Sequence, residues 1–316
     1  MKIDVLLGLQ WGDEGKGKVV DVLTPSYDMI ARFQGGPNAG HTIIFGGKKF
    51  ILHTIPSGIF SDKAKNVVGN GVILDPFIMR KELAMLDEHD IPARERLFVS
   101  RKSHLITPAH RLLDAVYEKS RGREKIGSTL KGIGPTYTDK VARLGIRTGD
   151  IHENDFRSRY ARLKEQHMRI VSSFGCSAGD FTFDGLTFSD YEAAWFEALG
   201  IFDGLQLVNS EYFVNQALDR GEKLLAEGAQ GSMLDIDFGT YPFVTSSNTI
   251  SAGVCSGLGV SPHRIGEVFG IFKAYCTRVG SGPFPTELLD ADGDLMRETG
   301  HEFGSTTGRP RRCGWL

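Results

Sequence analysis

Residues 3–23, IDVLLGLQWGDEGKGKVVDVL, decide the fold class of this chain. Residues 3–9 are an apolar run rich in leucine and β-branched side chains, a glycine-rich loop follows, and residues 18–23 have a helical pattern that ends at Thr24-Pro25. This order predicts a strand, a phosphate-binding loop and a helix. A chain built from such units is typical of a largely parallel sheet with ligand loops at the carboxyl ends of its strands.

Further apolar runs lead into glycine loops in the same way. Residues 29–33 predict a strand that enters the loop GGPNAGHT, and residues 223–227 predict one that opens into a glycine turn. Residues 43–52 predict a hairpin on two glycines, and residues 268–277 predict a single buried strand. Helical spacing appears in three other segments, the last of them charged and expected to be an exposed helix: residues 75–89, 108–120 and 156–173.

Together these patterns predict an α/β fold with a largely parallel central sheet and surrounding helices. We expect one α/β domain over residues 1–316, because neither a repeat nor a low-complexity linker divides the chain. Residues 174–189 are rich in glycine, serine and phenylalanine without a clear period, so we interpret them as a surface excursion.

Composition excludes several classes of protein. The chain of 316 residues carries a net charge of −2, which leaves no basic surface of the kind that nucleic-acid binding requires. No apolar stretch is long enough to span a membrane, and the apolar N-terminal run meets a glycine and acid loop instead of a signal cleavage site. Its 4 cysteines form no CxxC pair and are expected to be reduced thiols. We therefore expect a cytoplasmic protein without nucleic-acid or membrane partners.

The loop of residues 8–18 resembles a P-loop that lacks two of its usual residues. Its glycines and Lys16 supply the backbone N–H groups and the cation that cradle phosphates. Gln10 stands where the pattern GxxxxGK[ST] begins with glycine, and Gly17 replaces the Ser or Thr that would hold Mg²⁺. Asp13 is the nearest hard oxygen donor and is therefore the expected magnesium ligand. The alternative is a glycine-rich turn with solvated charges.

Four other segments carry residues suited to anions or to proton transfer. His41, in the glycine loop of residues 35–42, can act as a general acid near neutral pH, although a structural histidine is the alternative. Residues 127–140 form a Gly/Thr loop with two lysines, residues 227–237 follow a strand, and residues 304–312 carry three arginines, whose planar fork suits carboxylate and phosphate. Each segment alone could be a solvated turn, but their combination indicates a nucleotide site.

In this order, the loops resemble the adenylosuccinate synthetase family. The match extends over the whole chain through the blocks QWGDEGKGK, GGPNAGHT, IPSGI, GNGV, KGIGPTYTDKVAR, EGAQG, LDID, TYPFVTSSNT, KAYCTRVGSGPFPTE and GHEFGSTTGR. This resemblance implies a ligase that joins IMP to L-aspartate, with GTP hydrolysed to GDP and phosphate, through a 6-phosphoryl-IMP intermediate. It also implies a P-loop-like GTP-binding fold and Mg²⁺ as the metal.

Roles for individual residues follow from the same resemblance. Asp13 is implied as the base that takes the purine ring proton, His41 as the acid that stabilises the leaving phosphate oxygen, and Asp13 with the carbonyl of Gly40 as the metal ligands. A viral branch of the family that aminates a guanine nucleotide has serine at the position of Asp13, so the carboxylate favours IMP. The residues implied to contact GTP are Gly12, Asp13, Glu14, Gly15, Lys16, Gly17, Lys18, Gly40, His41 and Thr42. Asn38 and Ala39 of the second glycine loop are also implied as ligand-binding residues.

The resemblance also implies an IMP site, an aspartate loop and a homodimer in which Arg143 reaches the neighbouring site. Residues implied to contact IMP are Thr129, Gln230, Thr245 and Arg309, and those of the loop that closes on aspartate are Ser305, Thr306, Thr307, Gly308, Arg309 and Arg311, the last also a GTP contact.

Several features depart from the family pattern. Leu130 stands where a glycine is expected, and Pro310 interrupts the arginine run. A Lys-x-Asp guanine-recognition segment and a later Gly-Pro turn do not occur after the arginine loop, so we expect the chain to be incomplete at its C-terminus. Two alternatives stay open: a non-catalytic fragment that binds IMP and dimerises, and a GTPase-like switch.

Overall fold

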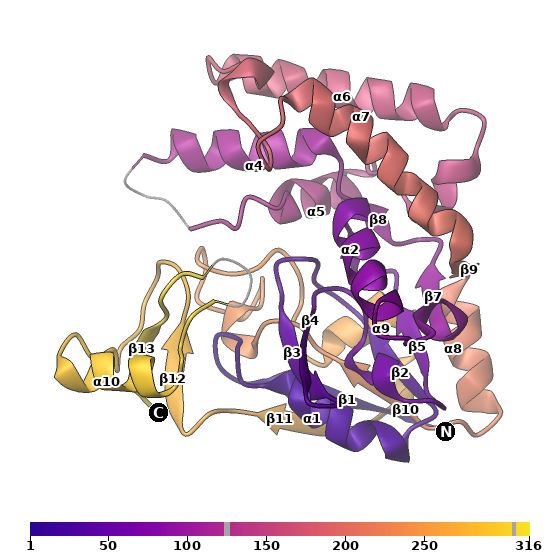
Figure 1. Ribbon diagram of the computed structural model, residues 1–316, viewed down its shortest axis with the longest axis vertical. Coiled ribbons are helices and arrows are strands. Elements are labelled where there is room, and N and C mark those ends of the chain that lie inside the picture. Colours follow the sequence, from indigo (N-terminus) through magenta and orange to yellow (C-terminus); the bar gives the residue numbers. More distant parts are fainter. Residues whose placement is uncertain (123–126, 305–307) are drawn as a thin grey trace.

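A seven-stranded parallel sheet forms the centre of the protein. The computed structural model describes residues 1–122, 127–304 and 308–316 (Figure 1). Every pairing within this sheet is parallel, which confirms the prediction of a largely parallel α/β fold. Its strands, in spatial order, are β11 (Ile265–Ile271), β1 (Ile3–Gly8), β10 (Leu224–Glu227), β2 (Met29–Arg32), β5 (Lys65–Val68), β7 (Leu97–Ser100) and β9 (Gln206–Val208).

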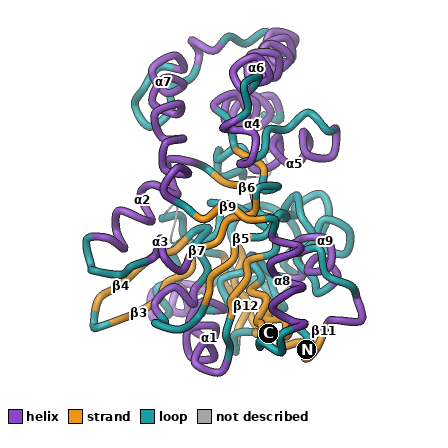
Figure 2. The backbone as a smooth tube through the Cα atoms, turned by 90° about the vertical axis from the view of Figure 1, so that its right-hand side faces the viewer, coloured by secondary structure: helices purple, strands orange, loops and turns teal. Residues whose placement is uncertain are grey.

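Helices cover both faces of the sheet because the central strands are apolar on both sides. On β1, Val5 and Leu7 pack with residues of α8 (Ser210–Asp219) and α9 (Ala252–Leu258), while Leu6 packs with Val20 of α1 (Lys16–Leu23) on the opposite side. Figure 2 shows the positions of these three helices around the strands. The continuous apolar run of residues 3–9 thus reflects a strand buried from two directions.

A layer of helices lies beyond one end of the sheet and comprises α4 (Pro108–Ser120), α5 (Ile133–Ala142), α6 (Phe156–Ser173) and α7 (Phe188–Ala198) (Figure 1). The predicted helix of residues 156–173 is confirmed, but one of its faces is buried, because Tyr160, Leu163, His167 and Val171 recur at helical spacing. None of the described helices combines the length and the apolar character needed to cross a membrane.

Asp139 of α5 joins three of these helices in the interior. Its Oδ2 lies 2.7 Å from Nε2 of His110 on α4 and 2.8 Å from Nε2 of His167 on α6. His110 Nδ1 accepts the backbone N–H of Thr107 at 2.9 Å, so Nε2 carries the ring hydrogen and donates it to Asp139. The hydrogen bond between His110 and Asp139 therefore joins α4 to α5, and His167 of α6 lies against the same carboxylate.

The remaining elements are short. The expected hairpin is present as β3 (His41–Phe45) and β4 (Lys48–Leu52) across Gly46 and Gly47. The helices predicted at residues 75–89 and 108–120 agree at both ends with α2 (Pro76–Asp87) and α4 to within two residues. The other short elements are α3 (Ala93–Arg96), α10 (Ala291–Thr299), β6 (Ile73–Leu74), β8 (His104–Leu105), β12 (Tyr275–Arg278) and β13 (Arg312–Trp315), with 3₁₀ turns at Thr24–Ser26, Ser57–Phe60, Thr148–His152, Ala178–Asp180, Leu199–Gly204, Ser232–Leu234 and Pro262–Arg264.

Two predictions about secondary structure were wrong. Residues 268–277 form two strands, because the chain leaves the sheet after β11 and pairs again only as β12 with β13, and Val268 on the edge strand is 48% exposed. Residues 127–140 are a loop only up to Gly132, whose φ of 76° starts α5. Gly and Thr are weak helix formers, and their number in this segment concealed the helix.

Residues 174–189 pack on the helical layer through two aromatic side chains. Phe183 and Phe188 are buried in a cluster with Leu112 and Val116 of α4. Asp184 adds an ion pair with Arg111 at 2.9 Å. Irregular segments often contribute such side chains to a core without showing a period in the sequence.

Candidate active site

Three glycine loops leave the same edge of the sheet. β1, β10 and β2 are neighbouring parallel strands, and their carboxyl ends lead into residues 9–15, 228–231 and 33–40. Glycine allows these loops to touch, since a Cβ on Gly35 would lie 2.9 Å from the Cβ of Ala229. Gln230 itself has a φ of 57°, a left-handed conformation that is rare for a residue with a side chain. Strained backbone of this kind gathers at functional sites.

The loop before α1 turns its N–H groups and its lysine toward negative charge. One oxygen of Glu14 accepts the backbone N–H groups of Gln10 at 3.0 Å and Gly12 at 2.9 Å, and the other lies 2.6 Å from Lys16 Nζ. Both charged side chains are buried. The carboxylate of Glu14 thus accepts hydrogen bonds from the backbone N–H groups and the lysine that a P-loop would present to phosphate.

Gly17 explains why the usual Ser or Thr of the P-loop is absent. A Cβ at this position would lie 2.8 Å from the Cβ of His41 and 3.1 Å from Ser57 Oγ. Any larger residue would push His41 away from the first turn of α1. Glycine in place of Ser or Thr at position 17 therefore leaves the space that the side chain of His41 occupies.

His41 is held by a buried carboxylate at the end of a neighbouring strand. Its Nδ1 lies 2.5 Å from Oε1 of Glu227, the last residue of β10. Burial, and next the charge of Arg32, lower the pKa of His41, whereas Glu227 opposes this shift. Despite burial, the hydrogen bond from His41 and the charge of Arg32 lower the pKa of Glu227, so the carboxylate is ionised at neutral pH.

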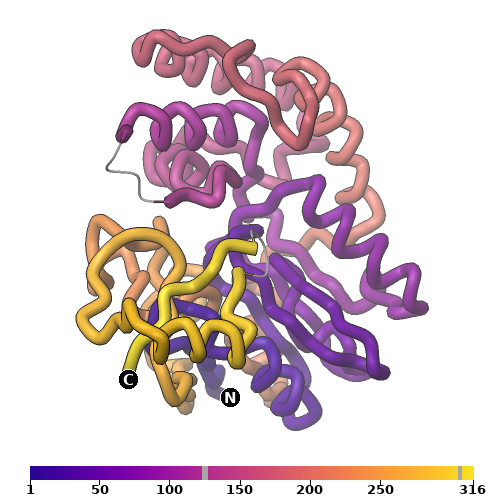
Figure 3. Tube along the Cα trace, turned by 60° about the vertical axis from the view of Figure 1, so that its left-hand side comes forward, coloured from indigo at the N-terminus to yellow at the C-terminus, as the bar shows by residue number. Residues whose placement is uncertain are grey.

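Asp13 pairs with an arginine from the opposite end of the sequence. Arg311 Nε lies 2.9 Å from Asp13 Oδ2, and Arg311 Nη1 donates to Glu302 Oε2 at 2.6 Å. Lys273 Nζ donates to the other oxygen of Glu302 at 2.7 Å. Figure 3 shows the yellow C-terminal segment beside the N-terminal half of the chain. The side chain of Asp13 is 31% exposed, so solvent or a ligand can reach it.

Other predicted residues also meet around these loops. Gln230 Nε2 donates to Asn38 Oδ1 at 3.2 Å, and Arg309 Nη2 donates to the carbonyl oxygen of Gly127 at 3.0 Å. The second contact brings the arginine segment against the loop of residues 127–132, which includes Thr129. Leu130 in that loop has a φ of 55°, so the glycine expected there would have been free of strain.

The remaining predicted residues lie around this centre or outside it. Arg143 is exposed at the end of α5, and no contact within the described ranges joins its side chain to the other predicted site residues. Thr245 is half-buried and its N–H donates to Leu234 O at 2.9 Å. Ser305, Thr306 and Thr307 lie outside the described residues. The others are Gly15 at the start of α1, exposed Lys18 on α1, Ala39 and Gly40 just before β3, Thr42 on β3, and exposed Gly308.

Three side chains that the sequence patterns did not single out belong to this site. Arg32 and Glu227 each end an apolar strand, and both are fully buried, as is Ser57. A charged residue at the end of a run such as KLLAE is a signal that could have marked Glu227, because an unpaired charge is seldom buried.

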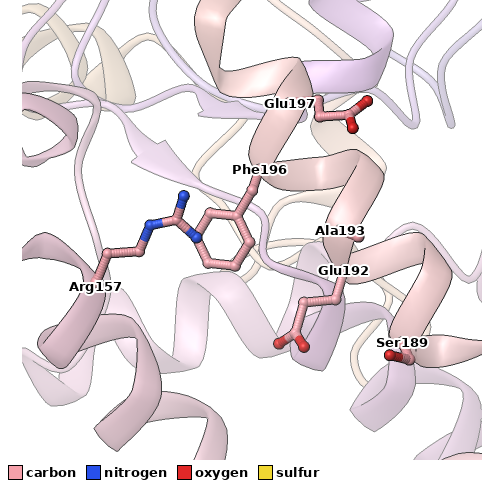
Figure 4. Close-up of a pocket in the computed structure, with 6 residues that line it drawn as sticks. All are labelled: Arg157, Ser189, Glu192, Ala193, Phe196 and Glu197. Atoms are coloured by element: carbon pink, nitrogen blue, oxygen red, sulfur yellow. The ribbon is translucent and has the colours of Figure 1, made fainter.

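A separate pocket lies between α6 and α7. It has a volume of about 510 Å³ and is lined by the six residues labelled in Figure 4, among which the Arg157 guanidinium lies 3.7 Å from the centre of the Phe196 ring. None of the predicted site residues lines it. The glycine loops, and not this pocket, therefore form the candidate site.

Comparison with known proteins points to a single family. A family model described as adenylosuccinate synthetase matches residues 5–316. The adenylosuccinate synthetases of Bacteroides fragilis and Porphyromonas gingivalis are each 59% identical to the chain, covering 100% of it and 73% of their own length. The solved structure of fully ligated adenylosuccinate synthetase from Plasmodium falciparum has a TM-score of 0.87 at 39% identity and covers 100% of this chain and 72% of that one. A cyanophage S-2L succinoaminodeoxyadenylate synthetase shares the fold, with a TM-score of 0.68 at 21% identity, over 100% of this chain and 78% of that one.

Proposed function

The chain belongs to the adenylosuccinate synthetase family, and from this membership we propose how its loops carry out the reaction of the family. The function is that of a GTP-dependent ligase, which joins IMP and L-aspartate into adenylosuccinate and releases GDP and phosphate. The observation that carries our assignment is the meeting of Asp13, His41 and Arg311 around the start of α1.

In the first step, Asp13 accepts the proton from the purine ring nitrogen of IMP. The oxygen at C6 then carries the negative charge and attacks the γ-phosphorus of GTP. As this new bond forms, the bond between the γ-phosphorus and the bridging oxygen of GDP breaks, which gives 6-phosphoryl-IMP and GDP. The partly exposed carboxylate of Asp13, on a loop beside the first turn of α1, supports this role.

His41 stabilises the charge that develops on the departing phosphate oxygen. Its position against Gly17 supports this role, because the imidazole then lies at the turn where the phosphate loop enters α1. Among the described residues, Nε2 of His41 has no hydrogen-bond partner, so it is available to a ligand.

In the second step, the amine of aspartate attacks C6 and phosphate leaves. Arg309 and Arg311 are suited to the carboxylates of aspartate and to phosphate oxygens, since guanidinium groups bind such groups in pairs of hydrogen bonds. Arg309 already touches the loop that carries Thr129, which supports a shared IMP and aspartate site.

The residues present also fit Mg²⁺. Asp13 offers an accessible carboxylate oxygen, and with Gly17 lacking a hydroxyl, the carbonyl of Gly40 before β3 would complete the protein ligands. When bound, Mg²⁺ neutralises negative charge on the phosphates of GTP. The role of the protein is then to hold these two oxygens beside the glycine loop.

We also propose a homodimer in which Arg143 contributes to the neighbouring site. The apolar side chains next to Arg143 support this proposal. In the single chain Val141 is 81% exposed and Leu144 is 47% exposed, and exposed apolar side chains of this kind are often buried in an interface. An exposed arginine flanked by apolar side chains suits an interface between two copies.

Release of phosphate tests the proposed function. With GTP and IMP present, the ligase releases phosphate only when aspartate is added. Release from GTP alone would favour a GTPase-like switch. Measurable IMP binding without any turnover would favour a non-catalytic, IMP-binding fragment that forms dimers.

A further inference from the structure

Glu227 occupies an unusual position for a carboxylate. It ends β10 in the middle of the sheet, between β1 and β2, and its side chain is fully buried. Both of its oxygens are engaged: Oε1 lies 2.5 Å from His41 Nδ1 and 2.6 Å from Ser57 Oγ, and Oε2 accepts the backbone N–H of Ser57 at 2.8 Å. The carboxylate therefore binds the histidine while its other contacts fix its own orientation.

This arrangement determines the orientation of the His41 ring. An ionised carboxylate only accepts hydrogen bonds, so Nδ1 must carry a hydrogen, and Nε2 points the opposite way. From another side the ring is confined by Gly17, where even a Cβ would be 2.8 Å from the Cβ of His41. The imidazole is thus held between a strand end and the first turn of a helix.

Arg32 supplies a positive charge close to the carboxylate of Glu227. It is fully buried at the end of β2, and its Nη1 lies 4.0 Å from Glu227 Oε1. Within the described residues, none of its guanidinium nitrogens has a hydrogen-bond partner. A buried guanidinium is costly unless a negative charge is close, so Arg32 and Glu227 stabilise each other in the charged state.

We propose that Glu227 is a positioning residue of the ligase, which holds His41 with Nδ1 as donor and Nε2 turned toward the transferred phosphate, and that Arg32 is its buried counter-ion. The role of His41 in phosphate transfer rests on the proposed function, whereas the ring orientation rests on contacts within the chain. The opposing interpretation is a purely structural ion cluster that strengthens the centre of the sheet.

Glu82 provides a matched control. It is buried as well, and its carboxylate accepts backbone N–H groups of His53 and Thr54, but none of its hydrogen bonds to the described residues involves a histidine ring. Glu82→Gln and Glu227→Gln therefore make the same chemical change to a buried, hydrogen-bonded carboxylate. Only the second alters the partner of His41.

Steady-state kinetics separate the two interpretations. We expect Glu227→Gln to lower kcat by about 100-fold, with KM for GTP and IMP changed by less than about threefold. The reason is that the His41 ring loses its fixed orientation, whereas the contacts of the protein with GTP and IMP are kept. Glu227→Asp, which keeps the charge, is expected to retain more activity than Glu227→Gln. Glu82→Gln is expected to keep kcat within about threefold of the wild type. Equal losses in the two glutamine variants, or an unchanged kcat in Glu227→Gln, would overturn the proposal.

Nuclear magnetic resonance tests the ring directly and without turnover. In the ligand-free wild-type protein, ¹H–¹⁵N correlations of the histidine rings at one fixed pH should show a hydrogen on Nδ1 of His41, assigned by comparison with His41→Gln. Absence of a hydrogen on Nδ1 would refute the proposal even if Glu227→Gln does not fold, and even if the ligase assay succeeds. If the assay fails while Nδ1 is the donor, the proposed function is wrong and the orientation by Glu227 stands.

Discussion

The guanidinium of Arg311 bridges Asp13 and Glu302, with Nε 2.9 Å from Asp13 and Nη1 2.6 Å from Glu302. The carboxylate that we propose as the base is therefore paired before any substrate is present. We expect Asp13 to exchange this partner if Mg²⁺ or IMP binds to the same carboxylate oxygen. Arg311 remains anchored through Glu302 and can turn its free edge toward a new anion.

Substitution of Asp13 tests its role as base and metal ligand. We expect Asp13→Asn to lower kcat by at least about 1,000-fold, since the amide neither accepts the proton nor holds the metal well. The assay is adenylosuccinate formation at saturating substrates. Asp21→Asn, on the following helix α1, should leave the rate near that of the wild type. A rate for Asp13→Asn within tenfold of the wild type would contradict the mechanism.

Arg311 should matter for its shape as well as its charge. Lysine has a single compact ammonium group and lacks the planar, widely spaced N–H groups with which a guanidinium reaches two carboxylates. We expect Arg311→Lys to raise KM for GTP by about tenfold or more. The neighbouring Arg312 pairs with Glu287, so Arg312→Lys is a control that should change this KM by less than about twofold. Equal effects of the two changes would exclude a specific role of Arg311.

Leu130 should carry backbone strain. Its φ of 55° is unfavourable for a residue with a Cβ, and its side chain is 42% exposed, so little burial is lost on truncation. Leu130→Gly is therefore expected to raise the free energy of unfolding, measured in urea titrations, by up to about 1 kcal/mol. The relief of backbone strain should exceed the entropy cost of introducing glycine. Ala161→Gly, at an exposed site within α6, should lower the free energy of unfolding by about 1 kcal/mol. A loss of stability in Leu130→Gly would show that this φ is not strained.

Stability should fall as the solution becomes acidic. Burial, followed by the charges of Lys140 and Arg147, lowers the pKa of His104 to about 3, and burial also lowers the pKa of His110. Each histidine is then neutral in the folded protein but takes up a proton in the unfolded chain below about pH 6.5. Below that pH each group removes up to about 1.4 kcal/mol of stability per pH unit, until the folded pKa is reached.

Urea titrations between pH 7.5 and 5 measure this slope. We expect His104→Gln to reduce the slope, whatever its effect on stability at pH 7.5, because one group that takes up a proton on unfolding has been removed. Replacement of the exposed His263 by Gln should leave the slope unchanged. A slope that is the same in all three proteins would show that His104 is not the group responsible.

Mixing two inactive variants tests whether active sites are shared. In a homodimer with Arg143 reaching across, the Asp13→Asn subunit still offers Arg143, and the Arg143→Ala subunit still offers Asp13. A mixture of the two, allowed to exchange subunits, is expected to form adenylosuccinate although neither parent does. Failure to regain activity, with exchange shown by native mass spectrometry, would argue for sites built from one chain.

The loops could be predicted from sequence because each depends on residues close together in the chain. The strand before Gly12, the loop of residues 8–18 and the hairpin on Gly46 and Gly47 each follow from local patterns, and all are present. The pairing of His41 with Glu227 could not be predicted in this way. It depends on β10 lying between β1 and β2, an order that no local pattern encodes.

Other failures have different physical causes. α5 was hidden because its first turn follows a left-handed glycine and its residues are poor helix formers. The apolar run of residues 268–277 predicts a single strand, because apolar periodicity does not reveal where a chain leaves a sheet. The bridge from Asp13 through Arg311 to Glu302 joins the two ends of the sequence, and only the fold brings them together.

The contact between Gly17 and His41 restricts how this nucleotide loop can change in evolution. A hydroxyl side chain on α1 and an imidazole from β3 compete for one small volume, so a protein can have one arrangement or the other. A serine introduced at Gly17 would displace His41 before it could serve any new purpose. Conversion to a conventional P-loop would therefore need coordinated replacements on α1 and β3.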